Sequence, residues 1–148
     1  MATDNLSLET INPADYVDPD IFNRNFNKID PLGNAYVTDA GTNGEWYYRK
    51  WSDGRLECWL AKTFNSVAIN NAWGGWYISS PIADIAFPFT FTSIPHMTLS
   101  WATTDGNSAI AFSNTGLSTT KTGGINLGKG GSGTSTGVLS IHVSGKYQ

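Results

Sequence analysis

Residues 45–64 read EWYYRKWSDGRLECWLAKTF, in which aromatic or aliphatic side chains alternate with polar ones on both sides of a Ser-Asp-Gly turn. Alternation with a period of two predicts half-buried β-strands, and the Asp53-Gly54 pair between the two runs predicts a hairpin. A three-residue loop with Gly54 in the left-handed conformation fits this pattern best. We therefore expect an antiparallel hairpin as the clearest element of the fold.

The register of this hairpin separates its side chains into two faces. One face pairs aromatic and charged residues across the two strands: Tyr47 with Trp59, Arg49 with Glu57, and Trp51 with Arg55. The other face carries a more apolar set: Trp46, Tyr48, Leu56, Cys58 and Leu60. A two-residue turn would shift the pairing by one position and mix the two faces. We expect a sheet that is covered on both sides.

The remainder of the chain also favours β-structure. Further strands are expected at residues 76–79, 87–92, 97–103, 109–113, 125–127 and 138–146, with turn sequences between them. Short strands at this spacing are typical of a sandwich or a partly closed barrel. We predict a mostly β head domain over residues 36–148, an antiparallel, jelly-roll-like β-sandwich. Pro88 and Pro95 should lie at strand starts or edges, because proline cannot donate to a ladder.

Residues 1–35 are predicted to be a polar lead followed by a short helix. Asp18 is a suitable N-cap, and Pro19 suits the first position of a helix over residues 18–30. Its apolar stripe, at the spacing i, i+4 and i+7, consists of Phe22, Phe26 and Ile29. A helix of about three turns is marginal alone in water. The stripe must therefore pack against the domain or against identical helices of other subunits.

Charge and cysteine content exclude several classes of partner. Nine Lys and Arg residues against twelve Asp and Glu residues give a net charge of −3, without the basic excess that nucleic acid or an anionic membrane requires. No apolar run approaches the roughly 20 residues of a membrane span, and residues 1–20 lack the pattern of a signal peptide. Cys58 is the only cysteine, which excludes an intrachain disulfide and fits folding in the cytoplasm. We expect no nucleic-acid and no membrane partner.

Partial sequence motifs for catalysis or cofactor binding are present, but the residues around them do not fit such a site. Residues 123–129 fit part of a phosphate-binding loop, but Gly130 stands where Ser or Thr would ligate magnesium, and a strand follows where a helix should open. The two histidines, His96 and His142, lie outside any zinc motif. The Asp and Glu residues that could form a glycosidase pair can be explained by turns and ion pairs. We therefore expect no catalytic residue, no metal and no cofactor.

Tryptophans next to glycines are the candidate ligand contacts. Residues 73–76 read Trp-Gly-Gly-Trp, and two glycines between two tryptophans indicate an exposed loop rather than a strand interior. Flat aromatic rings can stack on the apolar face of a sugar. The candidate sugar contacts are Trp73, Trp76 and Tyr77. Packing in the core or in a subunit interface is the alternative explanation.

Three blocks of sequence, in this order, resemble a known family. They are YYRKWSDGRLECW (47–59), FPFTFTSIPHMTLSW (87–101) and GVLSIHVSGKYQ (137–148). Together they resemble the C-terminal head domains of tail-fibre and other tail-associated proteins from phages and prophages of Gram-positive bacteria. The resemblance covers about residues 36–148.

The resemblance implies a β-sandwich that trimerises about the fibre axis and binds a host-surface receptor, often a carbohydrate. It implies a virion protein that assembles in the host cytoplasm, needs no signal peptide, and attaches to other virion proteins through its N-terminus. The subunit contacts would then be the stripe of Phe22, Phe26 and Ile29 together with the hairpin face of Tyr47, Arg49, Trp51, Glu57 and Trp59. Aromatic residues and Arg are enriched in interfaces, which agrees with this placement.

The expected function is that of a non-enzymatic, homotrimeric fibre head that binds a bacterial surface glycan. One departure from the family is that only about 35 residues precede the head, where fibre proteins usually carry a long shaft. A free-standing, monomeric carbohydrate-binding module or lectin is the first alternative. A depolymerase that cuts the glycan is the second, and it requires two carboxylates in one cleft.

Overall fold

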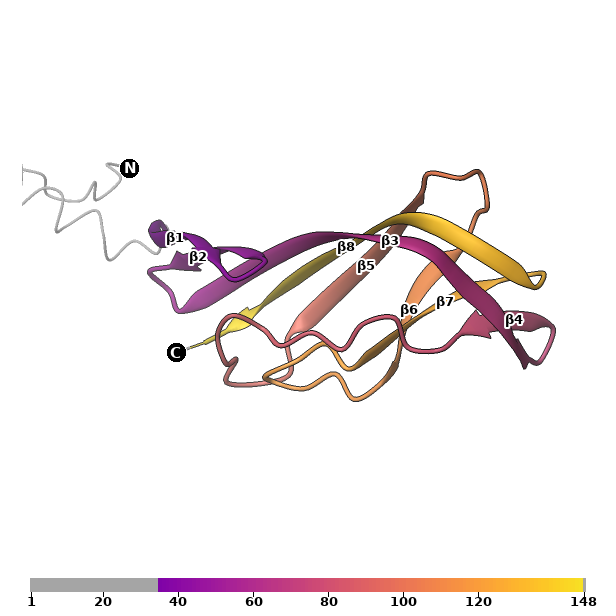
Figure 1. Ribbon diagram of the computed structural model, residues 1–148. Helices are drawn as coiled ribbons and strands as arrows, with labels where there is room; N and C mark the ends of the chain where they lie inside the picture. The colour runs from indigo at the N-terminus through magenta and orange to yellow at the C-terminus, as the bar shows by residue number, and fades with distance from the viewer. Residues whose placement is uncertain (1–34, 148) are drawn as a thin grey trace, which may run out of the picture. The chain divides into compact units, whose positions relative to one another are not determined.

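The structure is a computed structural model that describes residues 35–147 (Figure 1). Within this range the chain forms eight strands and no helix. The strands are β1 (Val37–Asn43), β2 (Trp46–Trp51), β3 (Arg55–Trp73), β4 (Trp76–Ser79), β5 (His96–Thr103), β6 (Ile110–Thr115), β7 (Gly124–Lys129) and β8 (Gly133–Lys146). The helix expected over residues 18–30, with the stripe of Phe22, Phe26 and Ile29, lies outside the described residues and stays a prediction.

The β2–β3 hairpin has the predicted register. Tyr47 pairs with Trp59 and Arg49 pairs with Glu57. Gly54 has a φ of 79°, and its backbone N–H donates to the carbonyl oxygen of Trp51 at 3.0 Å. This conformation is one that glycine adopts without steric cost, so the three-residue loop is confirmed.

Every strand pairing is antiparallel, which confirms the predicted mostly antiparallel β-structure. The order β1-β2-β3-β4-β7-β6 forms one path, and β8 pairs with both β3 and β5. These pairings join all eight strands in a single sheet, so a jelly-roll-like sandwich of two separate sheets is not confirmed. Figure 1 shows β3 and β8 running side by side as long curved strands.

The long strand β3 bends because its ladder is interrupted. Its register with β8 shifts between Phe64 and Val67, where Ser66 has a φ of 50°, and bulges of this kind bend strands. Its first part pairs with β2 and β8, and its last part, Ile69–Trp73, pairs with β4. β3 therefore continues beyond the predicted hairpin. Its last part pairs with β4, which in turn pairs with β7, and β7 pairs with β6.

The core lies against the apolar face of the hairpin. Its buried members include Trp46, Leu56, Cys58, Leu60, Phe87, Phe91, Ile125, Leu139, Ile141 and Val143. Burying each large side chain contributes about 1.5–3 kcal/mol relative to leaving it exposed. The indole Nε1–H of Trp46 donates to the carbonyl oxygen of Ala86 at 2.9 Å, which fixes the segment after β4 over this face.

The strand expected at residues 87–92 is wrong. The segment is irregular, and its backbone N–H groups bond to a second loop: Phe87 donates to Thr120 and Phe91 donates to Thr119, at 2.8 and 2.9 Å. Pro88 removes one donor from this run, so a continuous ladder cannot form. The rings of Phe87 and Phe91 meet edge to face at 5.4 Å and fill the core instead.

Candidate functional site

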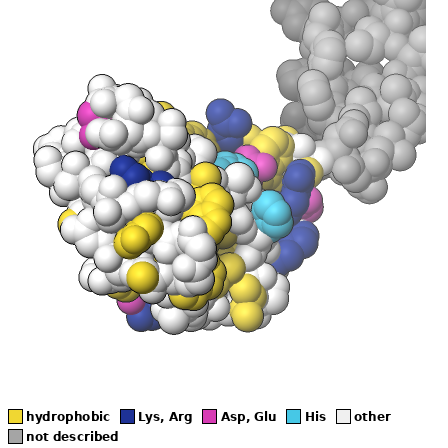
Figure 2. Space-filling model, turned by 90° about the vertical axis from the view of Figure 1, so that its right-hand side faces the viewer, with side chains coloured by type: hydrophobic (Ala, Val, Ile, Leu, Met, Phe, Trp, Pro, Cys, Tyr) yellow, Lys and Arg dark blue, Asp and Glu magenta, His cyan; other side chains and the backbone are white. Residues whose placement is uncertain are grey.

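An apolar groove lies at the end of the sheet that carries the β3–β4 hairpin. Its volume is about 320 Å³. It is lined by Trp73 from β3, Trp76 and Ile78 from β4, Ile110 and Phe112 from β6, and Gly128 from β7. Figure 2 shows this end of the domain, where hydrophobic side chains reach the surface in several patches. The groove thus combines side chains of the consecutive strands β3 and β4 with those of β6 and β7, a pair that lies further along the chain.

The two tryptophans are held by a tight hairpin turn. Trp73 is the last residue of β3 and Trp76 the first of β4, and the two pair directly across the strands. Gly74 has a φ of 60°, as the first central residue of a type II′ turn requires. The Trp-Gly-Gly-Trp segment is therefore a turn with a tryptophan at each strand end, which confirms that it does not lie inside a strand.

The ring of Trp73 stacks on the ring of Phe112, with centroids 5.8 Å apart and an angle of 9° between the planes. Gly128 makes room for this stack, because a Cβ atom there would lie 3.1 Å from Cε1 of Phe112. Trp73 remains 60% exposed and Trp76 remains 47% exposed. Each indole therefore presents much of its surface to solvent.

The structure brings together two of the three predicted sugar contacts. Tyr77 pairs with Ala72 and with Lys129, and it does not line the groove that Trp73 and Trp76 form. Successive side chains on a strand point to opposite faces, so Tyr77 faces away from Trp76. Tyr77 therefore lies outside the groove, and its contact with a sugar stays a prediction.

Sequence reasoning missed the part of the groove that comes from β6 and β7. Ile110 and Phe112 alternate on one face of β6, which is a readable signal. Nothing in the sequence shows that β7 lies next to β4, or that Gly128 lies between Phe112 and Ile78. That contact depends on the pairing of β7 with β4, which lie far apart along the chain.

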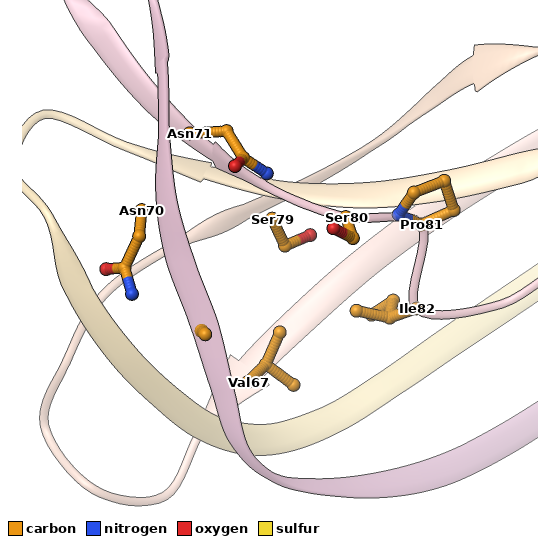
Figure 3. A pocket seen from close by; sticks show the side chains of 8 residues that line it. Val67, Asn70, Asn71, Ser79, Ser80, Pro81 and Ile82 are labelled. Carbon is orange, nitrogen blue, oxygen red and sulfur yellow. The ribbon is translucent and has the colours of Figure 1, made fainter.

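A second hollow, which we call the polar hollow for the amide and hydroxyl groups in its lining, lies between the end of β3 and the segment that follows β4 (Figure 3). Its volume is about 370 Å³. The residues that line it are Val67, Ala68, Asn70, Asn71, Ser79, Ser80, Pro81 and Ile82. Amide and hydroxyl groups therefore gather on the same hairpin that carries the tryptophans.

The predicted interface residues lie on the outer face of the β2–β3 hairpin. Tyr47 and Trp59 stack at 6.1 Å with 12° between their planes, and the guanidinium of Arg49 lies 5.2 Å from the centre of the Trp59 ring. The guanidinium of Arg55 lies 4.9 Å from the ring of Trp51. Glu57 pairs with Arg49 in the ladder. The structure thus places all five predicted residues on one hairpin, and their contact with another subunit stays a prediction.

This outer face continues onto neighbouring strands. His142 of β8 pairs with Trp59 on one side and with Thr98 of β5 on the other. A shallow hollow of about 250 Å³ there includes Tyr47, Trp59 and His142. In Figure 2 histidine, basic and acidic side chains gather on one flank of the domain. The face is therefore more polar and more charged than the tryptophan groove.

The carboxylates with shifted pKa values have structural roles. The pKa of Asp105 is lowered, first by the hydroxyl of Thr103 and then by the backbone N–H of Asn107 and of Thr136. The pKa of Asp53 is lowered chiefly by the backbone N–H of Arg55. Both shifts favour the ionised form, which is opposite to the raised pKa of a general acid in a glycosidase. These two residues therefore stabilise turns.

In residues 35–147 no three His, Cys, Asp or Glu side chains gather as ligands for a metal ion. In the same range no helix is long and apolar enough to cross a membrane.

Comparison with known proteins gives two partial similarities among solved structures, whereas no family model and no curated protein matches the chain. One is an N-truncated R2-type pyocin tail fibre, with 19% identity, a TM-score of 0.47, and coverage of 82% of this chain and 41% of that one. The other is a C-terminal fragment of the P. aeruginosa R2 pyocin fibre, with the same identity and TM-score and coverage of 82% and 28%. The chain thus spans less than half the length of either structure. At this level the similarity establishes neither a common fold nor a common function.

Proposed function

We propose that this chain is the head domain of a phage or prophage tail fibre, and that it binds a carbohydrate of the host cell surface without cleaving it. The observation that carries the proposal is the groove between Trp73 and Trp76. Exposed indoles beside an apolar floor offer the C–H face of a sugar ring a flat surface to stack on. An indole that served only the core would be buried, yet both of these are about half exposed or more.

The three sequence blocks that resemble tail-fibre heads support this proposal because they are neighbours in the sheet. Residues 47–59 lie in β2 and β3, residues 87–101 lead into β5, and residues 137–146 lie in β8. β8 pairs with β3 along one edge and with β5 along the other. Blocks that are separate in the sequence thus form one continuous surface.

We also propose a homotrimer in which the outer hairpin face and the stripe of Phe22, Phe26 and Ile29 make the subunit contacts. Stacked aromatics and a guanidinium over an indole are the chemistry enriched in protein interfaces. A trimer would hold three weak sugar sites on one particle, and several trimers would multiply them, so avidity would rise without tight individual contacts. The N-terminus would attach the head to other virion proteins.

The first alternative is a monomeric lectin, which would use the same groove and leave the outer hairpin face to solvent. The second is a depolymerase, which would require two carboxylates about 5–10 Å apart around a bound sugar. In the described part of the chain the residues that line the three hollows carry no carboxyl group. This observation favours binding over cleavage.

The test is a binding and cleavage measurement on the full chain with a panel of purified bacterial surface polysaccharides. Tryptophan fluorescence is followed during titration, and reducing ends are counted in the same samples. We expect a saturable change in emission with at least one polysaccharide and no increase in reducing ends. Growth of reducing ends would favour the depolymerase, and a panel without any binding would contradict the proposal.

A further inference from the structure

We infer that the glycan is an uncharged oligosaccharide of at least two sugar units, bound across the tryptophan groove and the polar hollow beside it. This inference rests on the proposed carbohydrate-binding function and names the class of its ligand. It comes from three observations: the two hollows adjoin each other, the polar one holds unoccupied hydrogen-bonding groups, and the lining of both is uncharged.

The two hollows adjoin along the β3–β4 hairpin. Asn71 of β3 pairs directly with Ile78 of β4. Asn71 lines the polar hollow, and Ile78 lines the tryptophan groove. Directly paired residues of an antiparallel ladder place their side chains on the same face of the sheet, about 5 Å apart. A ligand that stacks on Trp73 can therefore continue past this pair into the polar hollow.

Some polar side chains of the polar hollow form hydrogen bonds with the backbone of the domain, and others form none within the described residues. The Asn70 side-chain oxygen accepts from the backbone N–H of Gly133 at 3.1 Å, and the Ser79 hydroxyl accepts from the backbone N–H of Leu127 at 2.9 Å. Within residues 35–147 no hydrogen bond or ion pair occupies the side chains of Asn71 and Ser80, and both residues are exposed. In Figure 3 Asn71 stands on β3 and Ser80 on the segment that follows β4.

The available groups match the hydroxyls of a sugar. An asparagine amide offers two donors and an acceptor, and a serine hydroxyl offers one donor and two acceptors. A sugar hydroxyl both donates and accepts, so it can satisfy both residues. The volumes of about 320 and 370 Å³ lie near the lower end of the roughly 300–1,000 Å³ of small-molecule sites. Each hollow suits one sugar unit, and the pair suits two.

The lining of the two hollows selects against charge. Every residue that lines them has an uncharged side chain. A carboxylate or phosphate that entered would lose hydration and would find no cation among the lining residues, which is unfavourable. The net charge of −3 adds a further repulsion toward polyanions. Uronic acids and polyol phosphates are therefore poor ligands, and a neutral chain of hexoses is a good one.

The test is calorimetric titration of the full chain with neutral and acidic oligosaccharides, each at 50 and 500 mM NaCl. The neutral probes are gluco-, manno-, galacto- and chito-oligosaccharides of one to four units. The acidic probes are oligogalacturonates, hyaluronan oligosaccharides and glycerol phosphate polymers, and methyl-esterified oligogalacturonates serve as an uncharged match for the first of these. We expect a neutral probe to bind, with an affinity that changes less than about twofold between the two salt concentrations.

The length of the oligosaccharide probe and a double substitution in the polar hollow then show where the second sugar unit binds. Shortening the bound probe from two units to one should lower its affinity about tenfold or more. Asn71→Ala combined with Ser80→Ala should lower the affinity for the disaccharide about tenfold and leave that for the monosaccharide unchanged. Asn114→Ala is the matched control, because Asn114 is also exposed and lies outside both hollows. Thermal melting of each variant verifies that the fold is intact.

The outcomes separate this inference from the function on which it rests. Binding of an acidic probe that is lost with Trp73→Ala and weakened strongly by salt would overturn the uncharged ligand and leave carbohydrate binding in place. Equal affinity of the double variant and the unmodified chain for the disaccharide would overturn the second subsite. Absence of binding by every probe, neutral and acidic, would overturn both the inference and the proposed function.

Discussion

The indole ring of Trp73 lies parallel to the ring of Phe112, with centroids 5.8 Å apart, although β3 and β6 are not paired with each other. The stack spans β4 and β7, which lie between these strands in the sheet, and it covers a glycine in β7. The proposed binding surface is therefore a small aromatic cluster on the outside of a sheet rather than an opening in the core.

Trp73→Ala should lower the affinity for the glycan about tenfold, because stacked aromatic contacts contribute roughly 0.5–1.5 kcal/mol beyond the area they bury. Trp73 is 60% exposed, so the free energy of unfolding should fall by only about 1 kcal/mol. Titration calorimetry measures the first quantity and urea unfolding the second. Ile94→Ala is the control, since Ile94 is 65% exposed and lies outside the groove. If the Trp73→Ala variant bound the glycan with unchanged affinity, this groove would not be the binding site.

Gly128→Val should close the groove and weaken glycan binding about tenfold or more. A Cβ atom at this position would lie 3.1 Å from Phe112 and 3.8 Å from side-chain atoms of Ile110 and Ile78, so a branched side chain must push Phe112 away from Trp73. Overpacking of this kind typically costs about 1–3 kcal/mol. Titration calorimetry and the near-ultraviolet circular dichroism of the aromatic pair report the two effects.

Gly131→Val serves as the comparison for Gly128→Val. A Cβ atom at Gly131 would meet no heavy atom within 4 Å, so this variant tests the loss of a glycine without any crowding. Its affinity and its aromatic circular dichroism should match those of the unmodified chain. Equal glycan affinity for both variants would show that the floor of the groove does not control binding.

The hairpin could be predicted from the sequence because its information is local. Alternation in residues 45–64 and one glycine in the turn suffice to fix which residues pair, and Tyr47 lies opposite Trp59 as expected. The run at residues 87–92 also alternates, yet it is no strand, since Pro88 interrupts the ladder and the two buried phenylalanines point into the core. Periodicity alone does not distinguish these two cases.

The groove could be predicted only in part. Trp73 and Trp76 meet because a glycine turn joins them, and that turn is visible in the sequence. Phe112 and Gly128 join them through pairings of β4 with β7 and of β7 with β6. The pairing of β4 with β7 joins segments that are far apart in the sequence, so it depends on the global topology, which no local pattern encodes.

Asp105→Asn should lower the melting temperature at neutral pH, and the difference should shrink as the pH falls. The carboxylate accepts from Thr103 at 2.7 Å, from the N–H of Asn107 at 3.0 Å and from the N–H of Thr136 at 2.8 Å. Because these donors lower the pKa in the folded state, ionised Asp105 stabilises the fold above the unfolded pKa of about 3.9. That stability is lost as the pH falls from there through the folded pKa. Melting curves between pH 7 and pH 2 test this, and a difference that stays constant with pH would contradict it.

Cys58 should resist thiol reagents in the folded protein. Its side chain is buried in the core, and burial raises the pKa of the thiol to about 12, so little of the reactive thiolate exists at pH 8. Labelling with a chromogenic disulfide reagent should therefore be at least about a hundredfold slower in buffer than in denaturant. The denatured chain is its own control, since one cysteine gives one equivalent of label. Complete labelling of the folded protein within seconds would contradict the buried position.

Light scattering after size exclusion should give the mass of a trimer of 16.0 kDa chains. The double variant Phe22→Asp and Phe26→Asp should lower this association state, because a charged pair cannot form the apolar contact expected between three helices. Tyr47→Ala with Trp59→Ala should weaken assembly as well if the outer hairpin face is the second contact.

Two comparisons decide between a trimeric fibre head and a monomeric lectin. Asn23→Asp with Asn27→Asp adds the same charge outside the apolar stripe of Phe22, Phe26 and Ile29, so it should leave the association state unchanged. In a monomer the stripe would have to pack within the chain, and the Phe22→Asp, Phe26→Asp variant would then lose stability at constant mass. A monomeric mass for the unmodified chain would contradict the trimer, and the tryptophan groove would then act as a single site whose affinity must be sufficient without avidity.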